Sequence, residues 1–300
     1  MPFEDDPQEL SSEHRRAAAV LARSREMLQG TWFPKSYSAD EEEKLLQRQT
    51  ACKEFVFGPL RTLDAQERTI HPIKPIPRLP YLETWIDGLV REPDVINPKV
   101  RRMIKTLSAE GYLLWRIIER PGTYVAMVHA SMEDGVRHVE EDIKDVMWGC
   151  LPPWLKDQFN VEPAKGQLRL SHRMVGGKWQ LWDSWIVPYP TGARQLRSFG
   201  HGIVFWDEFS THPKAESASK GIVPTLFGRT HDRGQMIRMG TVNPDTASGR
   251  YFKKLYEYEN YRRARMIARF GAEIAEVACC LLYTSPSPRD GATSRMPSSA

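Results

Sequence analysis

The sequence has few of the features that mark a secreted, zinc-binding or membrane-spanning chain. It contains only four cysteines, and none lies in a CxxC pair or in a Cys/His spacing suited to zinc. We therefore expect reduced thiols and a cytosolic compartment. No apolar run approaches membrane-spanning length, and the acidic, polar N-terminus is unlike a signal peptide. The net charge of +4 does not by itself indicate nucleic-acid binding, so a DNA-binding surface would need local basic clusters.

The stretch from Ile203 to Glu208 is the strongest chemical signal in the chain. Four apolar residues are followed by two adjacent carboxylates, which is typical of a strand buried on both faces that ends in acids. At such a strand end, Asp207 can hold a nucleotide-bound Mg²⁺ and Glu208 can orient and deprotonate water. This is the Walker B pattern of ATP hydrolases. Two solvated acids after an ordinary strand are the alternative interpretation.

Residues 94–106 have the order of a phosphate-binding loop. A short apolar strand leads into a basic turn, and Lys105 and Thr106 then open a helix. Such a loop directs backbone N–H groups at phosphates, while the lysine neutralises charge and the threonine hydroxyl binds Mg²⁺. The pattern GxxxxGK[ST] is only half met, because Lys99 and Ile104 occupy the places of the glycines. A basic helix start without a ligand is the alternative.

The surrounding residues alternate between helical and strand patterns. The expected elements are a helix at 107–119, a strand at 123–130, a helix at 132–148, a β-rich excursion at 160–200, a helix at 213–227 and a strand at 235–241. This order predicts an α/β fold with a mostly parallel sheet flanked by helices, as in RecA-like (ASCE) P-loop NTPases. Thr241 ends the last strand, where it can contact a γ-phosphate or the attacking water; an ordinary turn is the alternative.

An aromatic segment precedes the phosphate loop. Residues 71–80 contain prolines that favour an extended chain, and residues 81–89 have helical spacing. Tyr81 and Trp85 on this segment could pack against an adenine ring. A linker followed by a packing helix is the other interpretation.

Taken together, these motifs resemble the ATPase half of a phage large terminase, the motor that packages DNA into viral heads. The family's phosphate loop typically reads Lys-Ser-Arg-Gln-x-Gly-x-[Ser/Thr], against residues 99–106 here. Three further motifs support the resemblance: Leu-Pro-Pro-Trp-Leu at 151–155, Ser-Phe-Gly-His at 198–201 and Gly-Thr-Val-Asn-Pro at 240–244. The resemblance covers roughly residues 70–260, and the order and spacing of the motifs are more specific than any one of them.

The resemblance implies ATP and Mg²⁺ as cofactors and assigns residues to them. Glu208 is the expected general base, Arg101 the charge-stabilising arginine and Thr241 the coupling residue, with Thr106 and Asp207 as Mg²⁺ ligands. The expected nucleotide contacts are Lys99, Arg101, Arg102, Met103, Ile104, Lys105, Thr106, Tyr81 and Trp85. Some terminases carry the working lysine early in the loop. Because Lys105 directly precedes Thr106 at the helix start, we expect Lys105 to be the main phosphate contact and Lys99 the second.

The resemblance also implies partners and a location. They are double-stranded DNA, a portal protein and a small terminase subunit, with a homo-oligomeric ring on the portal in the host cytoplasm and no membrane. DNA contact should be electrostatic and independent of sequence, because a motor must hold every sequence. The candidate contacts are Arg194, Arg197, Arg262, Arg263 and Arg265. For the last three, a solvated basic helix face is the alternative interpretation.

We expect three parts along the chain. Residues 1–70 form a helical N-terminal arm, residues 71–278 the ATPase domain, and residues 279–300 a tail that resembles translated sequencing-adapter read-through. The natural protein is then expected to continue, because the family's nuclease domain has no counterpart here. Two other functions remain open: a helicase-like ATPase, which needs a second RecA-like domain, and a non-catalytic nucleotide- or DNA-binding module, which Ile104 favours.

Overall fold

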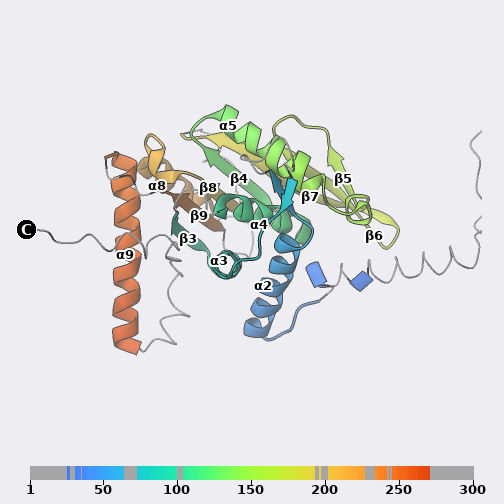
Figure 1. Cartoon of the computed structure of the whole chain (residues 1–300), viewed down its shortest axis with the longest axis horizontal. Helices are drawn as coiled ribbons and strands as arrows, with labels where there is room; N and C mark the ends of the chain where they lie inside the picture. The colour runs from blue at the N-terminus through green and yellow to red at the C-terminus, as the bar shows by residue number, and fades with distance from the viewer. Residues whose placement is uncertain are drawn as a thin grey trace, which may run out of the picture.

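A seven-stranded sheet forms the centre of the computed structural model (Figure 1). The structure describes residues 26–27, 31–34, 36–63, 73–99, 104–192, 196, 202–226, 234–241, 243 and 245–270, without the side chains of 223–225 and 259–270. The strands lie in the order β3 (Asp94–Pro98), β9 (Gln235–Gly240), β8 (Ile203–Trp206), β4 (Tyr124–His129), β7 (Lys178–Pro190), β6 (Leu168–Val175) and β5 (Phe159–Glu162).

The sheet has a parallel part and an antiparallel part. The pairs β3/β9, β9/β8, β8/β4 and β4/β7 are parallel, whereas β7/β6 and β6/β5 are antiparallel. The expected mostly parallel α/β sheet is therefore confirmed, and the antiparallel part is the expected β-rich excursion. β9 lies between β3, which precedes the expected phosphate loop, and β8, which precedes the two carboxylates. One strand between these two is the arrangement of the RecA-like P-loop class that the sequence predicts.

Side chains along β8 alternate between two hydrophobic cores. Ile203 and Phe205 belong to the larger core, and Val204 and Trp206 to the smaller one on the other side of the sheet. All four are buried, because helices cover both faces of a parallel sheet. The larger core includes α2 (Glu41–Phe57), α3 (Pro80–Arg91), α4 (Lys105–Glu119) and η1 (His138–Trp148), and the smaller one α8 (Ala215–Leu226) and α9 (Ala247–Phe270).

Short elements complete the described fold. They are the two-stranded antiparallel sheet of β1 (Arg61–Leu63) and β2 (Ile73–Pro75), α5 (Met132–Arg137), α6 (Pro153–Lys156) and the 3₁₀ turn η2 (Phe209–Thr211). The helix expected over 132–148 is two elements, since α5 continues as the π-helix η1. π-Helical segments are rare, and they occur frequently at functional sites.

The expected separation of an N-terminal arm at residue 70 does not hold for α2. Phe55 and Val56 of α2 are fully buried in the same core as Leu82 and Trp85 of α3. α2 therefore belongs to the same folded body as α3 and α4, because its apolar side chains are part of the same hydrophobic core. The expected tail at 279–300 lies outside the described residues.

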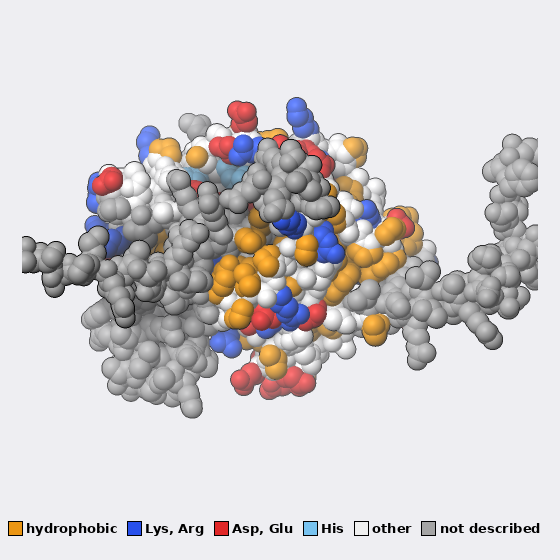
Figure 2. All heavy atoms as spheres, viewed as in Figure 1, with side chains coloured by type: hydrophobic (Ala, Val, Ile, Leu, Met, Phe, Trp, Pro, Cys, Tyr) orange, Lys and Arg blue, Asp and Glu red, His pale blue; other side chains and the backbone are white. Residues whose placement is uncertain are grey.

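On the face seen in Figure 2, positive and negative side chains are interspersed among the described residues. This distribution agrees with the small net charge of +4. The expected DNA contacts Arg194 and Arg197 lie outside the described residues, as do the side chains of Arg262, Arg263 and Arg265 on α9. None of the described helices has the length and apolarity needed to cross a membrane.

Candidate active site

The candidate site lies where β3, β8 and β9 end at the same edge of the sheet. Because the three strands are parallel neighbours, the residues that follow them meet at this edge. Lys99 follows β3, Asp207 and Glu208 follow β8, and Thr241 follows β9. The backbone N–H of Lys99 donates to the carbonyl of Gly240 at 2.9 Å, which continues the pairing of β3 and β9 up to the site.

Lys99 contacts three other side chains of this group. Its ammonium lies 2.5 Å from Asp207 Oδ1 and 3.1 Å from Glu208 Oε1, and it donates a hydrogen bond to Thr106 Oγ1 at 2.8 Å. The Lys99 side chain is only 10% exposed. Burial alone would lower the pKa of Lys99, but the charges of Asp207 and Glu208 outweigh it and raise that pKa. The lysine is therefore fully charged at neutral pH.

Thr106 and Asp207 present neighbouring oxygens. The Thr106 hydroxyl lies 3.3 Å from Asp207 Oδ2 and donates to it. Asp207 Oδ1 also accepts the N–H of Glu208 at 2.9 Å, which holds the carboxylate in place. Two ligands at right angles on an octahedral Mg²⁺, with bonds of 2.0–2.1 Å, are about 3 Å apart. The hydroxyl and the carboxylate are therefore spaced as two ligands of one magnesium ion would be.

Glu208 has an unusual backbone and an accessible side chain. Its φ of 47° is left-handed, a conformation that non-glycine residues rarely adopt and that is common at functional sites. The side chain is 41% exposed, so its carboxylate can reach a water molecule. The N–H of Thr241 points at Glu208 Oε2 across 3.5 Å, a long contact. Thr241 thus lies beside the candidate base, as its position after β9 predicts.

His212 supports this edge of the sheet, and the sequence analysis missed it. The Trp206 indole N–H donates to His212 Nδ1 at 2.9 Å, so the ring hydrogen is on Nε2, which donates to the Asp207 carbonyl at 2.7 Å. Burial lowers the pKa of His212, so the ring is neutral. The only signal in the sequence is a histidine shortly after the carboxylates.

Lys105 does not face the carboxylates, contrary to the ranking that made it the main phosphate lysine. Its side chain is buried, with the residue 2% exposed, and its ammonium donates to Asn97 Oδ1 at 3.2 Å. Burial lowers the pKa of Lys105 to about 8. Lys105 thus contacts Asn97 on β3, whereas Lys99 contacts the carboxylates.

Ile104 adopts the conformation for which the loop pattern reserves a glycine. Its φ is 57° and its ψ is 9°, and α4 starts at the next residue without a side-chain cap. The Ile104 side chain is half-buried against the larger core. Residue 104 therefore has the left-handed backbone that the loop pattern assigns to a glycine, at the expense of strain in a β-branched residue. Arg101, Arg102 and Met103 lie outside the described residues.

Trp85, one of the two aromatic residues expected to contact adenine, does not present a ring face to a ligand. Trp85 is fully buried, and its indole N–H donates to the carbonyl of Lys105 at 3.3 Å. It fixes α3 to the start of α4 and has no free ring face, so the expectation of a stacking role for Trp85 is wrong. Tyr81 is partly buried and packs against the same core.

Comparison with known proteins gives similarity in structure only. No protein-family model and no curated protein matches the chain. The solved large terminase ATPase domain of Thermus phage P74-26 is 17% identical with a TM-score of 0.44, over 60% of this chain and 69% of that one. The HK97 bacteriophage large terminase is 12% identical with a TM-score of 0.49, over 71% of this chain and 42% of that one.

A third solved structure contains a nucleotide. It is the large terminase from the thermophilic bacteriophage D6E in complex with ADP, 15% identical with a TM-score of 0.37, over 53% of this chain and 37% of that one. The chain thus spans less than half the length of the HK97 and D6E proteins. The solved structures to which this chain is similar are phage large terminases, the family that its sequence motifs resemble.

Proposed function

We propose that this chain is an ATP-hydrolysing subunit of a terminase-like motor that moves double-stranded DNA into a viral procapsid. The observation that carries the hydrolase part is the meeting of Lys99, Thr106, Asp207 and Glu208 within hydrogen-bond or ion-pair distance at one edge of a parallel sheet. A cation, a hydroxyl and two carboxylates at this place supply each function that phosphoryl transfer to water needs.

The residues fit a magnesium nucleotide. Thr106 and Asp207 would hold Mg²⁺ through their adjacent oxygens, 3.3 Å apart. When bound, the ion neutralises negative charge on the phosphate oxygens. Lys99 is the cation for the phosphates, because it is charged, lies at the site and has a long flexible side chain. The division of roles between the two lysines is thus proposed to be the reverse of the one expected from the sequence.

Glu208 is proposed as the general base. Its carboxylate is exposed enough to bind water and is close to the lysine that would hold the phosphates. Asp207 is more buried, with its side chain 9% exposed and both oxygens engaged, which suits a metal ligand better than a base. Arg101 remains the proposed charge-stabilising arginine on the family resemblance alone. Thr241, beside Glu208, is proposed to link hydrolysis to movement of the chain that follows β9.

The DNA-packaging part of the proposal is supported by the motif resemblance. Its partners would be double-stranded DNA, a portal protein and a small terminase subunit, with several copies of the chain in a ring on the procapsid in the host cytoplasm. Binding to DNA should weaken steeply with salt and depend little on sequence, because phosphate contacts dominate. Binding that is insensitive to salt, or that requires one sequence, would contradict a motor.

Turnover of ATP separates this proposal from a non-catalytic module, which the strained Ile104 in the loop favours. The experiment measures ATP binding and Mg²⁺-dependent phosphate release with and without double-stranded DNA, for the wild type and for Asp207→Asn. We expect hydrolysis by the wild type and little by the variant. ATP binding without turnover in the wild type would instead identify a nucleotide-binding module. Processive strand separation would indicate the helicase-like alternative.

A further inference from the structure

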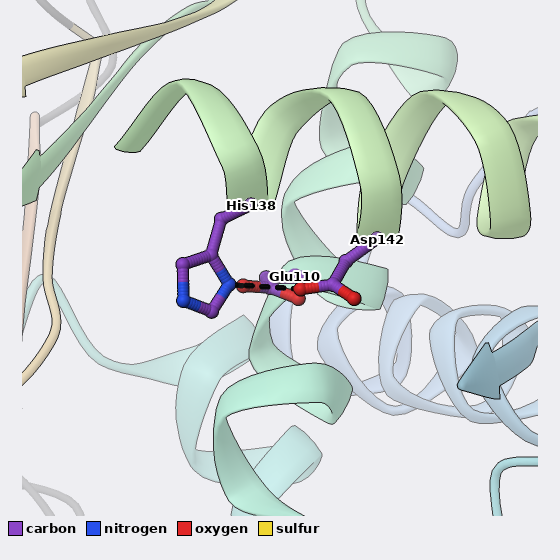
Figure 3. A group of neighbouring side chains, drawn as sticks. All are labelled: Glu110, His138 and Asp142. Atoms are coloured by element: carbon purple, nitrogen blue, oxygen red, sulfur yellow. Dashed lines mark ion pairs between the residues drawn. The ribbon is translucent and has the colours of Figure 1, made fainter. Parts of the chain in front are cut away.

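A second group of charged side chains meets one helical turn along α4 from Thr106 (Figure 3). Glu110 comes from α4, and His138 and Asp142 come from the π-helix η1, with their side chains pointing toward one another. The Glu110 side chain is fully buried, and those of His138 and Asp142 are 25% and 20% exposed. The nucleotide site as described above uses none of these residues.

The distances within the group are short, but they do not make a satisfied hydrogen-bond network. His138 Nδ1 lies 3.1 Å from Glu110 Oε1 and 2.9 Å from Asp142 Oδ2. One ring nitrogen carries at most one hydrogen and cannot donate to two carboxylates in good geometry. These two contacts are ion pairs that share one ring nitrogen, and among the described residues no well-formed hydrogen bond reaches either oxygen of Glu110. A fully buried carboxylate whose hydrogen bonds are not made is costly, so a ligand that binds all three side chains would satisfy it better.

We propose that Glu110, His138 and Asp142 bind one divalent transition-metal ion, with Zn²⁺ the best fit. One ligand atom from each residue lies within 4.8 Å of the others. Neighbouring ligands of a tetrahedral Zn²⁺, with bonds of 2.0–2.2 Å, are about 3.4 Å apart. The two measured separations of 3.1 and 2.9 Å need to open by only a few tenths of an ångström. Because Mg²⁺ prefers an all-oxygen octahedral shell, an imidazole ligand favours zinc over magnesium.

The charges also match. Burial would lower the pKa of His138, but Asp142 and Glu110 outweigh it and raise that pKa to about 10, so without a metal the ring is charged and pairs with the two carboxylates. A coordinating metal ion would displace this proton. The two carboxylates and the then neutral imidazole carry a charge of −2, which one divalent ion cancels in this buried place.

The ion would join two elements that matter for the nucleotide site. α4 begins directly after the phosphate loop, and η1 is the π-helix that starts at His138. A metal bound by side chains of both would fix α4 against η1, and its binding energy would stabilise the folded state. The role is structural, and it is independent of whether the chain hydrolyses ATP.

Zinc binding by the whole chain tests the proposal. The protein is stripped with a chelator, dialysed against Zn²⁺ in the presence of excess Mg²⁺, and analysed for bound metal and for its melting temperature. We expect one tightly bound zinc ion per chain and a higher melting temperature. Asp142→Asn, a partly exposed and nearly isosteric change, should weaken zinc binding by at least about 100-fold, as should Glu110→Gln.

Matched variants locate the site. His172→Asn changes a partly buried histidine on β6, and Asp207→Asn removes a carboxylate at the nucleotide site. Both should keep the zinc ion and the rise in melting temperature. The proposal is overturned if the wild type holds no stoichiometric zinc, or if folded Asp142→Asn binds it as tightly as the wild type. Loss of zinc in Asp207→Asn alone would place the ion at the nucleotide site and overturn it equally.

Discussion

Lys99 and Lys105 stand at the two ends of the same loop, and their surroundings are opposite. Lys99 lies at the sheet edge, where two carboxylates and a hydroxyl surround its ammonium. Lys105 is buried, and its ammonium donates to the Asn97 side chain. The pKa of Lys99 is raised by its carboxylates, whereas burial lowers that of Lys105 to about 8. The proposal that Lys99, and not Lys105, contacts the phosphates rests on this difference in environment, which position in the motif alone does not reveal.

Glu208→Gln removes the proposed general base, which is paired with Lys99, and should reduce the rate of ATP hydrolysis more than the loss of either lysine. General-base assistance contributes about 10²–10⁴-fold, so ATP hydrolysis should fall by that factor while ATP binding remains. The measurement is phosphate release beside nucleotide binding. Glu216→Gln on α8, an exposed acid outside the site, serves as the control and should hydrolyse normally. A Glu208→Gln variant with full turnover would exclude this residue as the base.

The variants Lys99→Ala and Lys105→Met together test which of the two lysines contacts the phosphates. Loss of a positioned cation that stabilises transition-state charge costs about 10²–10³-fold in rate, so Lys99→Ala should lose most hydrolysis and bind ATP more weakly. Lys105→Met removes a buried ammonium that does not face the carboxylates and should keep nearly the wild-type rate. If the rates were reversed, the lysine before Thr106 would be the phosphate lysine, as the sequence alone suggests.

The sheet and the carboxylate site follow from the sequence because they depend on local periodicity. β8 is a short apolar run, and Asp207 and Glu208 must lie at its end in any register. The direction of Lys105 does not follow, because the face that the first residue of α4 turns toward the core depends on the elements that pack around the helix. Trp85 fails in the same way: helical spacing predicts an aromatic face, but only tertiary packing shows that α4 covers it.

Two other features lie beyond local pattern. A π-helix differs from an α-helix by one residue in its hydrogen-bond spacing, and nothing in residues 138–148 marks that change in advance. Glu110 and His138 are far apart in the sequence, and only the packing of α4 on η1 brings them into contact. The left-handed backbone at Ile104 was, in contrast, foreseeable, because it occupies the place of a glycine in the loop pattern.

Lys105→Met should also change stability in a pH-dependent way. The lysine releases its proton near pH 8 when folded and near 10.5 when unfolded. Between these values the unfolded chain binds more protons, so the stability of the wild type rises with pH across this window. Below about pH 8 the burial penalty is complete, and the variant should be more stable by about 2 kcal/mol, after the lost bond to Asn97 is allowed for.

The measurement for this change is chemical denaturation of both proteins at pH 7 and at several values up to 10.5. The advantage of Lys105→Met should shrink as the pH rises through the window. Lys53→Met is a suitable control, because Lys53 is paired with Asp87 at 2.9 Å and its removal should not stabilise the chain. An advantage that stays constant with pH would show that packing of the methionine, not the buried charge, is responsible.

Ile104 should give the smallest effect, and it tests whether the loop between the two lysines is strained. Replacement by alanine or by glycine removes the same apolar contacts, but only glycine relieves the left-handed φ of 57°. In a helix interior alanine is more stable than glycine by about 0.5–1 kcal/mol. At Ile104 the order should invert, with Ile104→Gly more stable than Ile104→Ala by about 1 kcal/mol in denaturant titration. The pair Thr50→Ala and Thr50→Gly, on an exposed position within α2, should keep the ordinary order. If alanine were the more stable residue at both positions, the loop would not hold residue 104 in the left-handed region in solution, and the opposite placement of Lys99 and Lys105 would lose its backbone support.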